Sequence, residues 1–345
     1  MAMALSAVFP ASARLGIGWT KWHNRCGNLI QVRVIRVCNT LDFVRAGAWT
    51  PALGGVVSEP RLPAAVPSDA AAESGLVRRE RRALGTVVEI GVFASGVAAE
   101  AIVGHAFDAI GDAHARWSFH DPASELSRLN LSPGRWVAVS RSTVRLLRLA
   151  RALMRASEGA FDCTVGGWLV ALGALPDHGT VPALLRGRAA DIELQPFAAR
   201  LLRPVRLTLD GIAKGYAVDL AVRAMQQAGA SAGWVDAGGD LRVFGEVALP
   251  LYRRAADDRL VPLGTLREGA AATSSAWPAA PRDAQRLPAY LIARPGERRR
   301  TGCWTVFARQ AWRADGLTKV AAATAEARCA GVVASLGGRL ISAAA

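Results

Sequence analysis

Residues 205–245 hold the pattern that most restricts the fold, because a strand signal, a lysine-bearing loop and a helix signal follow one another directly. Alternating apolar residues that end at Leu209 predict a half-buried strand, which stops at Asp210. From Tyr216 the apolar residues recur at helical spacing, and a second strand is predicted after that helix. Lys214 is therefore predicted to lie where a strand leads into a helix.

The start of that helix has the chemistry of a phosphate site. Free backbone N–H groups and the positive end of the helix dipole favour an anion there. Glycines, one lysine and the carboxylates of Asp210 and Asp219 add the pattern of a phosphate bound together with a cation. The same residues also suit an ordinary strand–loop–helix connection with a surface lysine, and this stretch alone leaves both interpretations open.

Lysine is scarce in this chain, which makes its positions informative. The 345 residues carry 42 Lys and Arg against 28 Asp and Glu, a net charge of +14, yet the lysines are only Lys21, Lys214 and Lys319. The arginines are scattered, and no long basic run alternates with aromatic residues, so we expect no nucleic-acid partner. Arginine does not reproduce the compact, titratable ammonium group of lysine. Two lysines inside motif-like segments therefore indicate specific chemistry.

The cysteines and the apolar runs exclude several other classes of protein. Five cysteines stand far apart without a CxxC pair, which predicts neither a disulfide framework nor a zinc site. No apolar run reaches about 18 residues, so no transmembrane segment is expected. The first residues lack a positively charged region before their apolar stretch, and no convincing lipoprotein signal follows.

Periodicity divides the chain into two parts. Residues 1–76 are rich in prolines and small residues and show no sustained pattern, so we interpret them as a leader, a linker or a mis-set start, and expect them to be disordered. The organised part is expected to be one domain, residues 77–345. Its predicted elements are a strand over 86–93, a helix over 98–117, a short helix over 125–129 capped by Ser124, an amphipathic helix over 144–157 capped by Ser140 or Ser142, a loop-rich region over 176–204, a small-residue loop over 269–278, a strand over 304–310, and a helix over 314–327 capped by Asp315.

Seven motif-like segments follow one another in the organised part: ALGT (83–86), SFHDPASELSRLN (118–130), EGAFDCTVG (158–166), LDGIAKGYAVDLA (209–221), VDAGGDLRVFG (235–245), ATSS (272–275) and ADGLTKV (314–320). In this order they resemble the FAD:protein FMN transferase (ApbE) family, and the resemblance covers residues 77–338. It implies an α+β fold with mixed or antiparallel sheets flanked by helices, beside a poorly structured N-terminal extension. It also implies FAD as substrate, Mg²⁺ as cofactor, and transfer of the FMN moiety to a threonine hydroxyl of a target protein.

The resemblance assigns roles to residues of each segment. It implies Lys214 and Asp315 as catalytic residues, with Lys214 near the phosphates of FAD. The implied metal ligands are Asp315, Thr318 and a carbonyl at Ala213. The implied FAD-binding residues, besides Lys214, are Ser118, Asn130, Asp162, Thr164, Asp219, Gly238, Gly239, Asp240, Thr273 and Ser274.

Two departures from the family pattern bear on catalysis. The family usually has Asp-x-x-x-Thr at the metal site, whereas Lys319 stands four residues after Asp315 here and Thr318 comes one residue early. Lys319 shares a helix face with Asp315, so the two suit a plain ion pair. Because a protonated lysine cannot ligate Mg²⁺, replacement of part of the cation's charge or contact with a phosphate stays open as well. A His-x-Ile-Asp-Pro-x-Thr-Gly segment of many members is replaced by residues 290–296, which lack the His and the Asp.

The expected partner is an acceptor protein with a flavinylated threonine, by resemblance a subunit of a membrane redox complex. Two other functions stay open: binding of FAD without transfer, and hydrolysis of FAD to FMN and AMP. The resemblance implies a periplasmic or membrane-associated protein, and the lack of a convincing signal leaves the cytoplasm open as well.

Overall fold

The computed structural model describes residues 33–34, 75–94, 96–179, 182–254, 260–276 and 300–343. Its largest element is a seven-stranded sheet in which every neighbouring pair is antiparallel, in the order β13-β12-β11-β8-β7-β3-β2. The predicted α+β class is confirmed. The strands are β2 (Leu76–Ala83), β3 (Thr86–Phe93), β7 (Gly233–Ala237), β8 (Asp240–Phe244), β11 (Gly269–Ala276), β12 (Gly302–Ala308) and β13 (Gly338–Ala343).

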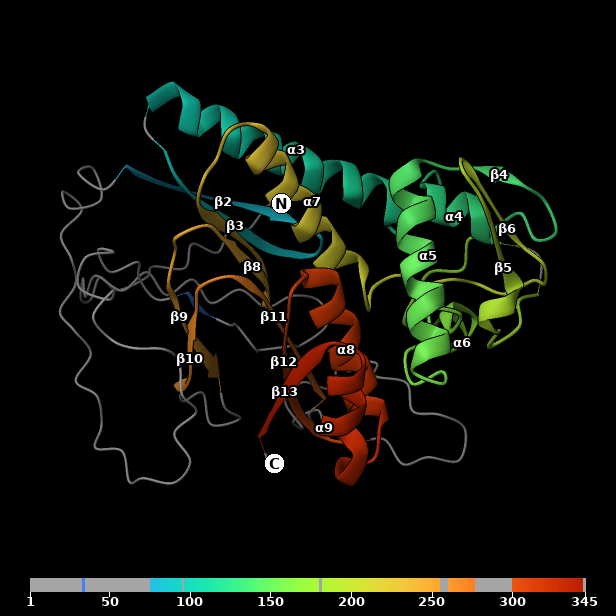
Figure 1. The fold of residues 1–345 in the computed structure, drawn as a ribbon. Helices are drawn as coiled ribbons and strands as arrows, with labels where there is room; N and C mark the ends of the chain where they lie inside the picture. Colours follow the sequence, from blue (N-terminus) through green and yellow to red (C-terminus); the bar gives the residue numbers. More distant parts are fainter. Residues whose placement is uncertain are drawn as a thin grey trace, which may run out of the picture.

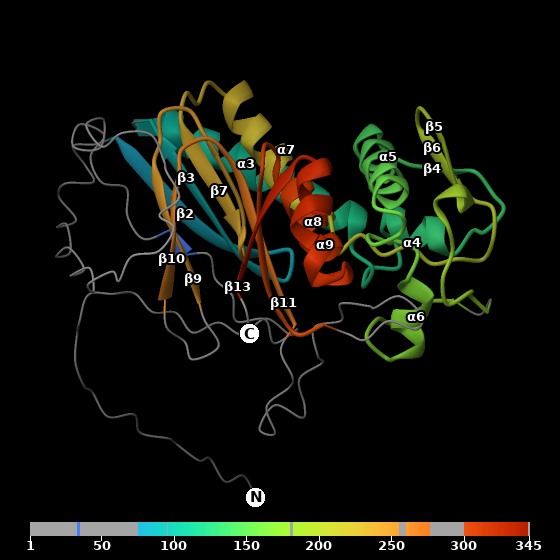
Figure 2. The ribbon, with the colours of Figure 1, turned by 60° about the horizontal axis from the view of Figure 1, so that its bottom comes forward.

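Helices cover one face of this sheet, and a small sheet lies beside the other face (Figures 1 and 2). Alternation along the strands explains the arrangement. Val88 and Ile90 of β3 belong to the main core below the helices, while Trp234 of β7 joins a second cluster with Leu249 and Leu251 of the small sheet. The helices are α3 (Gly96–Trp117), α7 (Ala213–Gln227), α8 (Ala311–Ala323) and α9 (Glu326–Ser335), and the small sheet is β1 (Arg33–Val34), β9 (Leu249–Arg254) and β10 (Leu260–Leu266).

Residues 118–204 form a smaller lobe at the end of α3 (Figure 1). Local capping begins two of its helices as predicted: Ser124 accepts a hydrogen bond from the Ser127 N–H, and Ser140 accepts one from the Thr143 N–H. The predicted loop-rich region contains the β-hairpin of β5 and β6, so that prediction was wrong in part. The lobe comprises α4 (Glu125–Asn130), β4 (Val137–Ala138), α5 (Arg141–Ala156), α6 (Gly166–Ala171), η1 (Ala189–Asp191), β5 (Ile192–Gln195) and β6 (Ala198–Leu201), with the sheet order β4-β6-β5.

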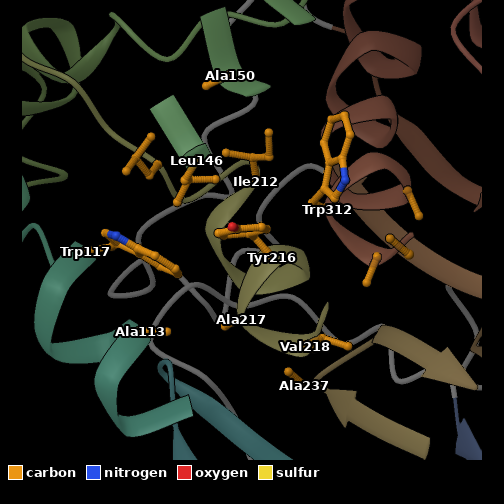
Figure 3. Close-up of a cluster of buried hydrophobic side chains, with 14 of the residues drawn as sticks. Ala113, Trp117, Leu146, Ala150, Ile212, Tyr216, Ala217, Val218, Ala237 and Trp312 are labelled. Carbon is orange, nitrogen blue, oxygen red and sulfur yellow. The ribbon is translucent and has the colours of Figure 1, made fainter. Parts of the chain in front are cut away.

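The first turn of α7 joins the lobe to the rest of the molecule (Figure 3). Tyr216 packs against Trp117 of α3 with 5.6 Å between the ring centroids, and the fully buried Ile212 lies beside it. Gly215 lets α8 approach closely, because a Cβ at this position would lie 2.3 Å from the Ala311 carbonyl oxygen. Residues 205–245, which carry the strongest sequence pattern, therefore also contain the helix that contacts α3, α8 and the lobe.

The predicted strand before α7 does not form a ladder. Residues 205 and 206 make only isolated bridges, and the rest of the segment is held by other means. The Asn130 side-chain amide donates to the Leu207 carbonyl at 2.8 Å and accepts from the Leu207 N–H at 2.7 Å. The Thr208 N–H donates to the Cys163 carbonyl at 2.9 Å. The hydrogen bonds of Leu207 thus go to a side chain and not to a neighbouring strand. An alternating apolar pattern in the sequence does not distinguish these two cases.

Three further predictions were wrong. The small-residue run over 269–278 is strand β11 up to Ala276, because its position between β8 and β12 supplies the hydrogen bonds. Asp315 is not a helix cap: α8 begins at Ala311, and the predicted helix over 314–327 is divided between α8 and α9. The second strand after α7 is a hairpin, β7 and β8, with its turn at Gly238 and Gly239.

Candidate active site

Two lysines, two aspartates and two hydroxyl groups meet where α7, α8, β8 and β11 come together; we call Lys214, Asp240, Ser274, Asp315, Thr318 and Lys319 the lysine site. Lys214 lies in the first turn of α7, and its Nζ is 3.1 Å from Oδ2 of Asp240 at the start of β8. The Asp240 side chain is 3% exposed and that of Lys214 is 34% exposed. One end of the ion pair is therefore sealed in the protein, and the ammonium end is open to an anion.

Charge and burial have opposite effects on this pair. The Asp240 carboxylate, followed by that of Asp315, raises the pKa of Lys214, which keeps the ammonium protonated. Burial raises the pKa of Asp240, and the charge of Asp315 adds to this, while both lysines lower it. Asp240 Oδ2 accepts no hydrogen bond within the described residues. Among the described residues, the groups that balance its negative charge are the ammonium groups of Lys214 and Lys319.

Asp315 is fully buried in the second turn of α8. Its Oδ2 accepts the Gly215 N–H at 3.1 Å, and its Oδ1 accepts a hydrogen bond from Lys319 Nζ. The close approach of α7 and α8 that Gly215 permits is what brings this N–H to the carboxylate.

Lys319 links Asp315 to β11. Its Nζ also donates to Ser274 Oγ at 3.0 Å, and Ser274 Oγ lies 2.7 Å from Thr318 Oγ1. The Thr318 hydroxyl donates to the Asp315 carbonyl at 2.7 Å. The sequence-based list of site residues omitted Lys319, although the scarcity of lysine and its i,i+4 spacing from Asp315 were signals for it. The predicted ion pair of Lys319 and Asp315 is confirmed.

Asp219 caps the start of α8. Its two carboxylate oxygens accept the N–H groups of Ala311 and Trp312, each at 3.0 Å, and it forms an ion pair with Arg242. The side chain of the N-cap residue Gln310 accepts the indole N–H of Trp312 and caps no backbone N–H of α8, so Asp219 satisfies these donors from another helix. Burial is the main cause that raises the pKa of Asp219.

The turn of Gly238 and Gly239 brings backbone close to β3. Both residues have positive φ, +64° and +100°, and a Cβ on Gly238 would lie 2.1 Å from Thr86 Oγ1. The Gly239 N–H donates to Asp236 Oδ1 at 2.8 Å, and burial raises the pKa of Asp236 to about 8. On β11, the hydroxyl of Thr273 lies 3.0 Å from that of Thr305, outside the hydrogen bonds of the lysine site.

The other predicted FAD-binding residues, Ser118, Asn130, Asp162 and Thr164, lie in the lobe, and the polar contacts of the Asp162 and Thr164 side chains stay within it. Thr164 is fully buried, and its N–H and hydroxyl donate to Asp162 Oδ1 at 2.7 and 2.6 Å. Asp162 Oδ2 accepts from Arg186 Nε at 2.6 Å, and the Gly187 N–H donates to Thr164 Oγ1 at 2.9 Å. We call Asp162, Thr164, Arg186 and Gly187 the Asp162 network.

Ser118 and Asn130 also hold backbone in place. The Ser118 carbonyl accepts the hydroxyl of the cap residue Ser124 at 2.7 Å, and Asn130 holds Leu207. Asn130 also lines a cavity of about 170 Å³ with Leu131, Pro133, His178, Gly179, Ala183, Pro204 and Arg206. The structure therefore places Asn130 between the segment that leads to Lys214 and a hollow of the lobe.

Gly211 connects the two groups of residues. A Cβ there would lie 3.3 Å from the Phe161 ring and 3.4 Å from Lys319 Cγ. The residue before Asp162 and the stem of Lys319 thus lie on either side of one glycine.

Metal-ligand clusters, disulfides and membrane-spanning helices can be assessed in the described part of the chain. It contains no group of three His, Cys, Asp or Glu side chains arranged to hold a metal ion. Its cysteines, Cys163, Cys303 and Cys329, are free and buried. None of the helices in the described ranges is long and apolar enough to cross a membrane. The segment over 290–296, where the family's His and Asp are missing, lies outside the described residues.

Comparison with known proteins gives a consistent result. The model of the ApbE family matches residues 84–339. A protein of Rhodobacter capsulatus named FAD:protein FMN transferase is 32% identical over 158 residues, which cover 42% of this chain and 30% of that protein. A protein of the same name from Haemophilus influenzae is 28% identical over 151 residues, with 39% and 44% covered. The matched parts therefore span less than half of these relatives.

Solved structures share the fold. The ApbE protein of Thermotoga maritima superposes with a TM-score of 0.63 at 24% identity, covering 77% of this chain and 94% of its own. The flavin transferase ApbE of Vibrio cholerae gives a TM-score of 0.63 at 20% identity, with 78% and 97% covered. With the family model matched over most of its length, this chain belongs to the ApbE family.

Proposed function

We propose that this chain transfers the FMN moiety of FAD to a threonine hydroxyl of an acceptor protein. The observation that supports it most is the Lys214–Asp240 pair, in which a buried carboxylate holds a partly exposed ammonium group at the start of α7. The N-cap residue Ile212 gives no side-chain cap, and the first turn of α7 is held from α8 instead, where Asp315 accepts the Gly215 N–H at 3.1 Å. The two sequence relatives are named FAD:protein FMN transferase, and this name supports transfer of FMN from FAD to a protein.

In this reaction the threonine oxygen forms a bond to the FMN phosphorus, and the bond from that phosphorus to the bridging oxygen breaks. AMP leaves with the electron pair of the broken bond, and the hydroxyl proton is released. Catalysis of phosphoryl transfer depends mainly on positioning and on neutralising charge at the phosphates. Lys214 and Lys319 supply two such charges in the lysine site.

The Mg²⁺ implied by the resemblance does not fit these residues in their present arrangement. Both Asp315 oxygens are hydrogen-bonded, one to the Gly215 N–H and one to the Lys319 ammonium, and the Thr318 hydroxyl pairs with Ser274 and the Asp315 carbonyl. At an effective dielectric constant near 20, a divalent ion 4 Å from one carboxylate gains roughly 8 kcal/mol and loses about as much to an ammonium group at the same distance. The two terms cancel, so we assign no step to a metal ion.

The test combines full-length protein with FAD and an acceptor domain that carries a threonine, with and without Mg²⁺. Mass spectrometry of the acceptor detects FMN as added mass, and chromatography detects AMP. We expect transfer by the wild type and none by Lys214→Ala or Asp315→Ala. The control is Arg223→Ala, which removes an exposed cation from the same helix. Equal transfer by all four proteins would remove the lysine site from the reaction.

Retention of FAD without transfer is the second candidate, and the ammonium group on Asp315 favours it. It predicts FAD bound in about equimolar amount, no AMP and no labelled acceptor. Release of AMP without acceptor would identify hydrolysis instead. The acceptor is proposed to be a subunit of a membrane redox complex, as the resemblance implies.

A further inference from the structure

We infer that Lys319 is a built-in cation of this site, and that its ammonium group replaces the divalent ion on Asp315. The inference rests on the proposed binding of FAD. It starts from the position of Nζ, which donates to Asp315 on its own helix and to Ser274 on β11 at 3.0 Å. These are oxygen atoms of the kind that a hard cation would use.

The ammonium group keeps capacity for a ligand. Lysine has three N–H donors, and the described residues accept two of them from Lys319. The side chain is 23% exposed, in contrast to the fully buried Asp315. One donor therefore remains for a phosphate oxygen beside the exposed ammonium of Lys214.

Surrounding residues fix the stem of Lys319. Gly211 lies against it, since a Cβ there would be 3.4 Å from Cγ and 3.6 Å from Cε of Lys319. Thr318 turns its hydroxyl toward Ser274 and the Asp315 carbonyl, which ties the same turn of α8 to β11. The position of the charge is thus set by three elements of the fold.

The substitution Lys319→Thr tests the inference, because it restores Asp-x-x-x-Thr and removes the charge. Mn²⁺ serves as the probe, titrated into full-length protein with FAD and followed by electron paramagnetic resonance. We expect the wild type to show no Mn²⁺ site tighter than about 1 mM. Lys319→Thr gains one site, and the double variant Lys319→Thr/Asp315→Asn loses it again.

FAD binding is measured on the same proteins by quenching of flavin fluorescence. We expect wild-type affinity to be the same in EDTA and in Mg²⁺. Lys319→Met, which keeps the stem and removes the charge, weakens binding about tenfold, as expected for one charge-assisted hydrogen bond. Circular dichroism confirms that each variant is folded, and Lys319→Thr carries the test if Lys319→Met is not.

The outcomes separate this inference from the proposed function. A wild-type Mn²⁺ site, or FAD binding that EDTA abolishes, would overturn the role of Lys319 even if transfer occurs. No transfer under any condition, with the metal and FAD results as expected, would remove the proposed function and leave Lys319 as the cation that holds FAD.

Discussion

The lysine site and the Asp162 network use similar residues in different ways. In the network, Asp162 bonds to Thr164 and Arg186, and the described polar contacts stay inside the lobe. In the lysine site, each buried carboxylate holds an ammonium group that remains 34% or 23% exposed. The difference teaches that a motif residue can serve by shaping backbone, as Thr164 does through the Gly187 N–H, or by presenting charge, as Asp240 does through Lys214. The exposure of the partner alone does not separate the two regions, because the Arg186 side chain is 22% exposed and that of Lys319 is 23% exposed.

Substitution of Gly215 is expected to have the largest effect, because this residue contributes both to the packing of α7 on α8 and to the lysine site. In Gly215→Ala, the new Cβ would lie 2.3 Å from the Ala311 carbonyl oxygen, which forces α7 and α8 apart. We expect a loss of about 3 kcal/mol in unfolding free energy, measured by urea denaturation. The control, Gly111→Ala on α3, has nothing within 4 Å of its Cβ and should be neutral or stabilising. Equal stability of the two variants would contradict the close contact.

The second prediction separates charge from stability within the lysine site. Lys214→Met, like Lys214→Ala, should abolish measurable transfer, a loss of at least about 100-fold in rate, because an ammonium group at the phosphates is lost. It should also lower stability, because Asp240 is left buried without its partner. The double variant Lys214→Met/Asp240→Asn should regain stability and no transfer. Recovery of both would show that the pair has only a structural role.

A third prediction concerns the lobe. Asn130→Ala removes both hydrogen bonds to Leu207, so we expect a loss of about 2 kcal/mol in unfolding free energy. Asn130→Asp keeps the acceptor for the Leu207 N–H and loses the donor to the Leu207 carbonyl. Its unfolding free energy should lie between those of the wild type and Asn130→Ala. FAD affinity of the folded variants should change less than stability does. A larger effect on affinity would place Asn130 with the binding residues.

The smallest effect is expected at Asp236, through pH. Its pKa is about 8 in the folded protein and near 4 in an unfolded chain, so the folded state keeps a proton that the unfolded state releases. Stability therefore falls as pH rises from about 4 to about 8. Asp236→Asn keeps an acceptor for the Gly239 N–H and removes the ionisation.

The partial exposure of this side chain limits the gain of Asp236→Asn to on the order of 1 kcal/mol at pH 8, with none at pH 4. Urea denaturation at both pH values measures it. A constant difference between variant and wild type would contradict the raised pKa.

Local signals in the sequence predicted local structure well. The caps Ser124 and Ser140 and the helical spacing of α3 and α5 depend on neighbouring residues, and they were predicted correctly. The family resemblance, which rests on the order of the motifs, was confirmed by the match of the ApbE family model. Strand β11 was missed because seven of its eight residues are Gly, Ala or Ser, which carry little strand signal, and its neighbours in the sheet decide its state.

Contacts between distant elements could not be predicted. The true start of α8 depends on Asp219, a residue of α7, and this contact moves Asp315 from a predicted cap to a buried position in the second turn. The spacing of Lys319 and Asp315 predicted their contact, and only the fold adds Ser274 of β11. The sequence thus indicated a contact within one helix, and only the fold connects that contact to β11; the roles of these residues stay a prediction.

The two hydrogen bonds between the Asn130 side chain and the Leu207 backbone also determine how much the length of the lobe can vary. Its two ends are 77 positions apart in the chain, so it closes a long loop. The entropy of loop closure rises slowly with length, by only about 0.6 kcal/mol for each doubling. Residues can therefore be inserted into or deleted from the outer turns of the lobe at little thermodynamic cost. If the hydrogen bonds between Asn130 and Leu207 still form, the position of the segment that leads to Lys214 is unchanged.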